Sequence, residues 1–200
     1  MSWGTVSSRT AWIFVGAVAF FEIASVIAFL AAADFSSATL NDPARLVAVG
    51  NRGADLLRAA ALLDMFGYLS AVPLAIYLRV RFRGQNAIDL LTLAGVLFLV
   101  LGALGAVILA YAGAPLVHEY ATASASGKQL AATAFAMIHR IVFFGMWQTL
   151  DAFPAGVWLL GTGRLAWRQG ARGLAAVLLA VGVFGLGFAV AHIVGFYPGS

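Results

Sequence analysis

Long apolar runs separated by short polar segments dominate the chain. Five runs are long enough to cross a bilayer, which takes about 20 residues in a helix. They cover residues 10–33, 54–78, 88–112, 130–162 and 174–197. Runs of this length are typical of membrane helices rather than of the amphipathic helices of soluble domains. The pattern predicts an all-α integral membrane helical bundle that forms one polytopic domain over residues 1–200.

The segments between the runs predict the connections. Asn41-Asp42-Pro43 is typical of an N-cap followed by proline in the first helical turn, so we expect a short interfacial helix at residues 43–50. Pro115 predicts the end of the third span, and residues 116–127 an exposed loop.

Three features are expected within the last three spans. The fourth helix is long enough to project beyond the bilayer or to kink at Pro154, and Gly161-Thr162-Gly163 predicts its end. Gly95, Gly102 and Gly105 should let a neighbouring backbone approach the third span closely. In the last span the small residues at 187, 191 and 195 predict a tightly packed face.

Composition and charge narrow the class of protein. Hydrophobic residues make up 62% of the chain and charged residues 10%, and the formal net charge is +4. Because the arginines gather at the ends of apolar runs, they indicate membrane orientation rather than binding of nucleic acid. Arg9 and the clusters Arg79–Arg83 and Arg164–Arg172 share one side of a five-span bundle, which predicts a cytoplasmic N-terminus and an outer C-terminus. The expected location is a bacterial inner membrane.

Two residue counts exclude some cofactor chemistry. The chain has no cysteine, which excludes disulfides, thiolate metal sites, iron–sulfur clusters and covalently attached haem. Its one lysine, Lys128, lies at a polar loop edge, which argues against a Schiff base inside the bundle.

Polar and ionisable residues inside the runs are the candidate site, because such groups need partners in a membrane. Arg140 calls for a carboxylate, and Asp64 matches its depth best, with Glu22 second. Spacings of four, three and four place Arg140, Phe144, Trp147 and Asp151 on one helical face, beside Gln148. An interhelical ion pair is the simpler interpretation, and a polar cavity that binds an anion or exchanges protons is the alternative. The candidate ligand-binding residues are Glu22, Asp64, His139, Arg140, Trp147, Gln148, Asp151 and His192.

Histidines suggest two further kinds of site. His139 and His192 lie at similar depth on consecutive helices, the geometry that bis-imidazole ligation of haem b requires. A hydrogen bond to a neighbouring helix is the competing interpretation of each. His118 and Glu119 are expected in the outer loop, as solvated residues or as part of a metal site.

The segment Asn51-Arg52-Gly53-Ala54-Asp55-Leu56-Leu57-Arg58, continuing through residues 63–68 and 73–75, resembles a family of uncharacterised bacterial multi-pass membrane proteins. Phe143-Phe144-Gly145-Met146-Trp147 and the glycine-rich last span are similar to it too. That family is catalogued as a domain of unknown function, so the resemblance implies a helical bundle and supplies no catalytic residues.

Three functions fit these observations. The first is a non-enzymatic accessory subunit or partner-binding module, in contact with lipids and with other subunits or a second copy through glycine and alanine faces. The second is a transporter or sensor that binds a small molecule or ion. The third is a redox protein that holds haem or quinone near His139 and His192. The first leads because it needs no additional motif.

Overall fold

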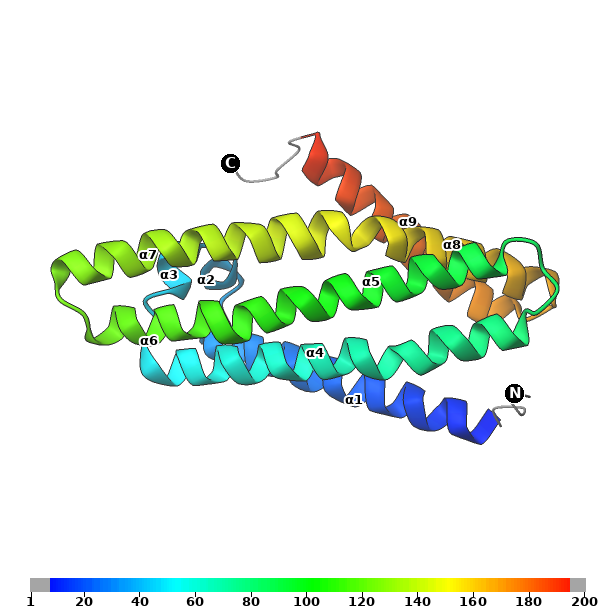
Figure 1. Cartoon of the computed structure of the whole chain (residues 1–200), viewed down its shortest axis with the longest axis horizontal. Coiled ribbons are helices and arrows are strands. Elements are labelled where there is room, and N and C mark those ends of the chain that lie inside the picture. The colour runs from blue at the N-terminus through cyan, green and yellow to red at the C-terminus, as the bar shows by residue number, and fades with distance from the viewer. Residues whose placement is uncertain (1–7, 195–200) are drawn as a thin grey trace. The chain divides into compact units, whose positions relative to one another are not determined.

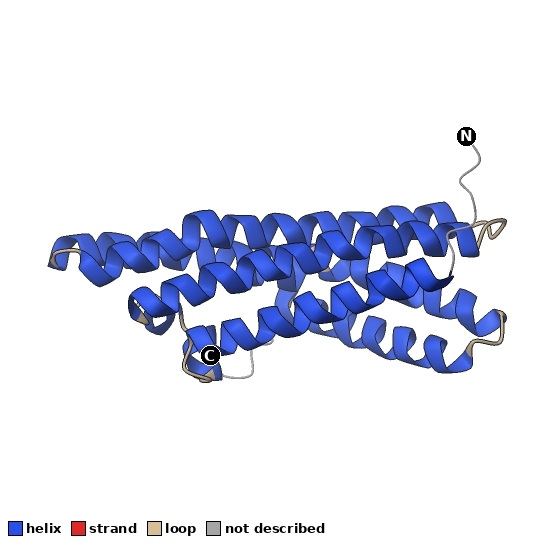
Figure 2. Cartoon of the chain, turned by 90° about the horizontal axis from the view of Figure 1, so that it is seen from below, coloured by secondary structure: helices blue, strands red, loops and turns tan. Residues whose placement is uncertain are grey.

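The computed structural model describes residues 8–194, apart from the side chains of residues 8, 9, 11 and 192. Every secondary-structure element in this range is helical, and short loops join the helices (Figures 1 and 2). The elements are α1 (Ser8–Ala32), α2 (Ser37–Asn41), α3 (Pro43–Leu46), α4 (Gly50–Arg81), α5 (Ile88–Ile108), the π-helical η1 (Leu109–Gly113), α6 (Ala114–Thr122), α7 (Ala125–His139), the π-helical η2 (Arg140–Leu150), α8 (Ala152–Arg168) and α9 (Arg172–Ile193). The predicted all-α class is confirmed.

Five helical stretches are long and apolar enough to cross a membrane, as the sequence predicts. They are Trp12–Ala32, Gly50–Arg81, Ile88–Thr122, Ala125–Arg168 and Arg172–Ala191. The second, third and fourth are longer than predicted, because their helices continue past the apolar core of each run.

Internal contacts divide the chain into two compact units. The first unit comprises Met1–Ala17, Tyr68–Gly102 and Met146–Ser200, and the second comprises Val18–Gly67 and Ala103–Gly145.

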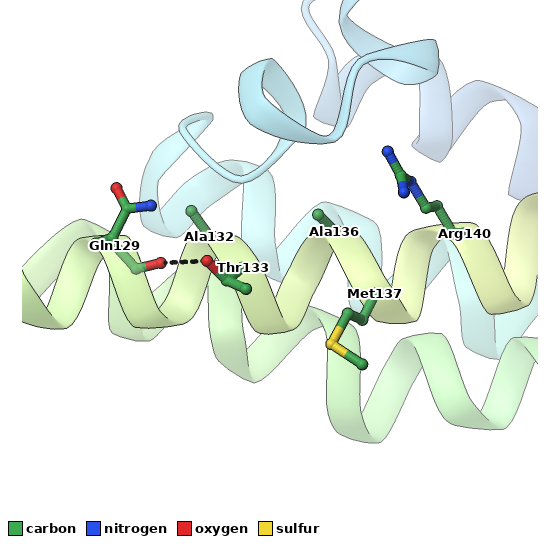
Figure 3. Close-up of a pocket in the computed structure, with 6 residues that line it drawn as sticks. All are labelled: Gln129, Ala132, Thr133, Ala136, Met137 and Arg140. Carbon is green, nitrogen blue, oxygen red and sulfur yellow. Dashed lines mark hydrogen bonds between the residues drawn. The ribbon is translucent and has the colours of Figure 1, made fainter.

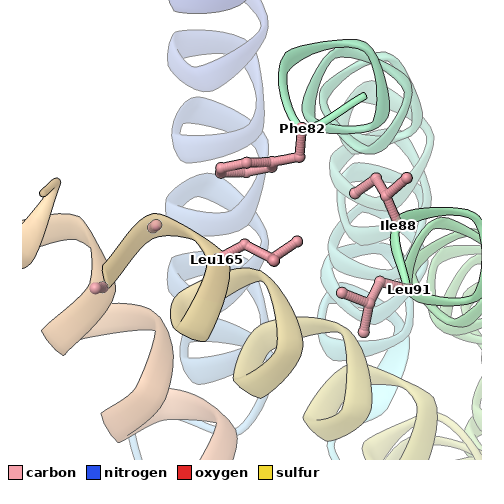
Figure 4. Packing of buried hydrophobic residues seen from close by; sticks show 6 residues of the cluster. Phe82, Ile88, Leu91 and Leu165 are labelled. Carbon is pink, nitrogen blue, oxygen red and sulfur yellow. The ribbon is translucent and has the colours of Figure 1, made fainter. Parts of the chain in front are cut away.

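In the first unit, the turn between α4 and α5 packs against the end of α8. Phe82, Ile88, Leu91 and Leu165 point toward one another in a buried cluster that also contains Ala166 and Ala175 (Figure 4). The end of α4 carries Arg79 and Arg81, and the end of α8 carries Arg168. Both arginine-bearing ends therefore lie at the same end of this unit.

Helices α8 and α9 lie side by side in the first unit through close contacts at glycines. Leu160 of α8 packs against Gly182 of α9, and Leu186 of α9 packs against Gly156 of α8. A β-carbon at either glycine would collide with the leucine. The small face predicted at residues 187, 191 and 195 does not make this contact. A β-carbon at Gly187 would have no neighbour within 4 Å, and residue 195 lies outside the described residues.

In the second unit, α1 packs along α4 and α7 packs along α6. Buried Ser25 of α1 donates a hydrogen bond to the Ala60 carbonyl of α4 at 3.0 Å, and the rings of Phe21 and Phe66 lie 5.7 Å apart. The short helix α3 also contacts α7. The N-cap of α3 is Asp42, whose carboxylate accepts a hydrogen bond from the Ala44 amide at 2.9 Å, so the predicted capping is confirmed. The sequence did not predict the short helix α2 that precedes it.

The predicted loop at residues 116–127 is wrong. The chain stays helical to Thr122, and a new helix begins at Ala125 with Ser124 as its N-cap. Pro115 lies directly after η1 within one continuous helical stretch. The wide π-helical turn accommodates a residue that has no amide hydrogen to donate to the Tyr111 carbonyl. His118 and Glu119 consequently lie on a helix.

The predicted helix end at Gly161-Thr162-Gly163 is also wrong. These residues lie inside α8, where Gly161 lets the Leu91 side chain of α5 approach and Gly163 lets Leu179 of α9 approach. The helix ends instead at Arg168, and Gly170, two residues beyond it, has a φ of +81° that suits glycine. The Gly170 amide donates to the Trp167 carbonyl at 3.1 Å and the Ala171 amide to the Ala166 carbonyl at 3.0 Å, which is a Schellman motif.

Candidate functional site

Asp151 ends the π-helical segment η2 and is only 3% exposed. Pro154 has no amide hydrogen to donate to the Leu150 carbonyl, as an α-helix would require. The preceding turn is wider instead, and the Asp151 amide donates to the Met146 carbonyl, five residues back, at 2.9 Å. The buried positions Val142, Met146 and Asp151 therefore follow steps of four and five, and the wide turn carries the carboxylate into the interior.

This geometry corrects the predicted helical face. Residues spaced four, three and four apart share a face at 3.6 residues per turn, but residues 140–150 are π-helical. Arg140 is exposed, whereas Asp151 is buried, so the two side chains do not share a face.

Within the first unit, Asp151 meets Tyr68, which in turn contacts residues of α5. The Tyr68 hydroxyl of α4 donates a long hydrogen bond of 3.5 Å to Asp151 Oδ2. The Tyr68 ring lies over Gly102 of α5 and meets the edge of Phe98 with ring centres 5.5 Å apart. Trp147 Nε1 donates to the Gly102 carbonyl at 3.1 Å. These contacts link α4, α5 and the chain that leads into α8 around one buried carboxylate.

Two buried polar atoms of the first unit lack a hydrogen-bond partner within the described part of the chain. They are Oε1 of the predicted site residue Gln148 and Oγ1 of Thr162. Buried polar groups are nearly always hydrogen-bonded, so such atoms point either to a weak spot or to a bound water or ion.

Replacing Thr162 with valine separates these two interpretations. If the hydroxyl is unpaired, the nearly isosteric change removes a buried polar group and leaves stability equal or raises it by about 1 kcal/mol. Thermal unfolding in detergent measures the change. A Thr162→Val variant that unfolds several degrees lower would show that the hydroxyl holds a water or ion.

His139 is fully buried in the second unit, where its ring contacts α2 and two phenylalanines. Its Nε2 atom donates to the Leu40 carbonyl of α2 at 3.1 Å, while Nδ1 is buried with no partner among the described residues. The imidazole stacks on Phe143 with ring centres 4.4 Å apart and meets the edge of Phe144 at 5.7 Å. With Nε2 engaged and one face covered, this environment fits a hydrogen bond between helices better than haem ligation. The side chain of His192 lies outside the described residues.

Arg140 lines a shallow pocket of about 370 Å³ on the second unit, together with Gln129, Thr133 and Met137. Figure 3 shows Gln129 and Arg140 extending from the same side of the helix. The ion pairs of the described residues join Arg45 to Asp42, Arg79 to Asp89, and His118 to Asp55. The predicted pair of Arg140 and Asp64 is not among them.

The two remaining carboxylates of the prediction lie half-buried in the second unit. Glu22 of α1 packs over Gly67 of α4, where a β-carbon would collide with the carboxylate. Asp64 lies on α4 and is engaged in a polar interaction of its own.

His118 has an arrangement that sequence reasoning missed. Its ring nitrogens lie 2.9 Å from Asp55 Oδ1 and 3.0 Å from Asn51 Oδ1, so it links α6 to the start of α4. A group of three or more histidine, aspartate or glutamate residues placed to hold a metal is absent from residues 8–194.

Sequence reasoning also missed Tyr68, Gly102 and Leu40 as partners of the predicted residues. Two of these partners act through backbone carbonyls, which carry no sequence signal. Tyr68 could have been found, since a tyrosine within a span needs a partner for its hydroxyl.

Comparison of this chain with protein-family models, with curated proteins and with solved structures finds no match. Functional inference therefore rests on the residues described above, and the resemblance to a bacterial membrane family stays a prediction.

Proposed function

We propose that this chain is a non-enzymatic multi-pass membrane protein that acts as an accessory subunit or partner-binding module. The observation that carries this proposal is how its buried polar side chains are engaged. Tyr68 bonds to Asp151, Trp147 to the Gly102 carbonyl and His139 to the Leu40 carbonyl. Each bond joins segments distant in sequence, which favours a role in holding helices together over a role in chemistry.

The first span supports partner binding. Only 6% of its apolar window is buried, compared with 44% of the window in Ile88–Thr122. Its large exposed side chains include Trp12, Phe20 and Ile23. Because so little of this span is covered by the rest of the chain, its outer face is open to another transmembrane helix as well as to lipid. We place the protein in a bacterial inner membrane, with its N-terminus in the cytoplasm and its C-terminus outside.

Photo-crosslinking in the native membrane tests this proposal. A photoreactive phenylalanine analogue replaces Phe20, which is 64% exposed, and a matched control carries it at Phe82, which is 4% exposed. We expect a single crosslinked protein from position 20 that also co-purifies at a fixed ratio in mild detergent. Crosslinks to lipid alone, together with purification free of other subunits, would contradict partner binding.

A small-molecule or ion-binding protein of the transporter or sensor type is the second candidate. The buried carboxylate of Asp151, at a π-helical turn, and the unpartnered Gln148 Oε1 in the same unit favour it. It predicts that a ligand raises the unfolding temperature of the wild type but not of Asp151→Asn. A screen of inorganic cations and small amines by thermal unfolding measures this difference.

A further inference from the structure

A groove of about 680 Å³ opens between α8 and α9 in the first unit. Its walls are formed by Leu160, Gly161, Arg164, Trp167, Arg168 and Leu179. The groove is chemically divided. Leu160 and Gly161 lie toward the middle of α8 and face Leu179 of α9, whereas the two arginines lie toward the end of α8.

The arginines of the groove are available to an anion. Arg164 and Arg168 are exposed and lie four residues apart, so they project from the same face of α8. Neither belongs to an ion pair in the part of the chain that the structure describes, unlike Arg79, whose Nε lies 2.6 Å from Asp89. Two adjacent guanidinium groups without a carboxylate suit the oxygens of a phosphate.

The apolar part of the groove suits a hydrocarbon chain. Gly161 has no side chain, and Leu160 and Leu179 form the neighbouring walls. Trp167 stands at the arginine end, 52% exposed, with the Arg172 guanidinium 5.8 Å from its ring centre. Tryptophan at this position is typical of the membrane interface, where a lipid headgroup meets its acyl chains.

We propose that this groove binds an anionic phospholipid of the cytoplasmic leaflet. The phosphate lies on Arg164 and Arg168, and an acyl chain lies along Leu160 and Leu179. Basic pockets at the cytoplasmic side of membrane helices bind anionic headgroups in this way. Arginines that only set the orientation of a helix in the membrane need no groove beside them. Here the two arginines adjoin the apolar part of a groove.

Native mass spectrometry and thermal unfolding with defined lipids test the site. The full chain is purified in detergent and titrated with phosphatidylglycerol or with phosphatidylcholine. The double variant Arg164→Gln/Arg168→Gln removes the proposed headgroup contacts. The matched control, Arg81→Gln/Arg83→Gln, removes two exposed arginines at the same end of the unit and outside the groove.

We expect the wild type and the control to retain phosphatidylglycerol and to unfold at higher temperature in its presence. The groove variant should bind it about 25-fold more weakly, since each arginine near an anionic surface contributes about fivefold. Equal losses in both variants would show a diffuse charge effect and overturn the site. Inorganic phosphate should not stabilise the wild type, and full stabilisation by phosphate alone would overturn a lipid as the ligand.

Discussion

Replacing His139 with alanine is expected to lower the free energy of unfolding by about 3–6 kcal/mol. Removing a fully buried ring leaves a cavity, and cavities of this kind cost about 2–5 kcal/mol. The Leu40 carbonyl also loses its donor, at a further cost of about 1 kcal/mol. The stacking contact with Phe143 disappears as well.

Unfolding by denaturing detergent measures this loss. Met137→Ala is the matched control, because Met137 lies on the same helix and is 62% exposed. The control should change stability by less than about 1 kcal/mol, since an exposed side chain leaves no cavity. Equal effects of the two substitutions would show that His139 is not packed as the structure shows.

Replacing Gly102 with alanine is expected to destabilise the first unit by about 1–3 kcal/mol, as overpacking of a close contact does. A β-carbon at this position would overlap the Tyr68 ring, which must then move away from Asp151. The Trp147 hydrogen bond to the Gly102 carbonyl holds the backbone there and resists a shift.

Gly187→Ala separates this packing effect from helix propensity. A β-carbon at Gly187 has no neighbour within 4 Å, and alanine in a helix gains up to about 1 kcal/mol over glycine. The Gly187 variant should therefore equal or exceed the wild type in unfolding temperature, while the Gly102 variant falls below it. A Gly102 variant as stable as the Gly187 variant would contradict the contact with Tyr68.

Hydropathy was sufficient to predict the helical class and the five spans, because a bilayer leaves the backbone few ways to satisfy its hydrogen bonds. Local sequence signals predicted the ends of helices less reliably, because contacts with neighbouring helices also determine where a helix ends. Pro115 and Gly161 are typical of helix ends, yet both lie within longer helical stretches. The π-helical turn η1 accommodates Pro115, and Gly161 makes room for Leu91.

The candidate site was predicted in part. Burial of Asp151 and His139 followed from their place in an apolar run, whereas their partners did not. The partner of His139 is a backbone carbonyl, and the orientation of Asp151 depends on a π-helical turn before Pro154. The spacing of Arg140 and Asp151 puts them on one face only in a regular α-helix. The π-helical turn between them cannot be predicted from that spacing.

The central claim is that buried polar residues of this bundle hold helices together. A double-mutant cycle of Tyr68→Phe and Asp151→Ala, measured by unfolding in lipid nanodiscs, tests it most directly. We expect a favourable coupling of about 0.6–1.7 kcal/mol between the two side chains, the range for hydrogen bonds between membrane helices. Additive effects with no coupling would contradict the claim, because the carboxylate of Asp151 would then not be held by Tyr68.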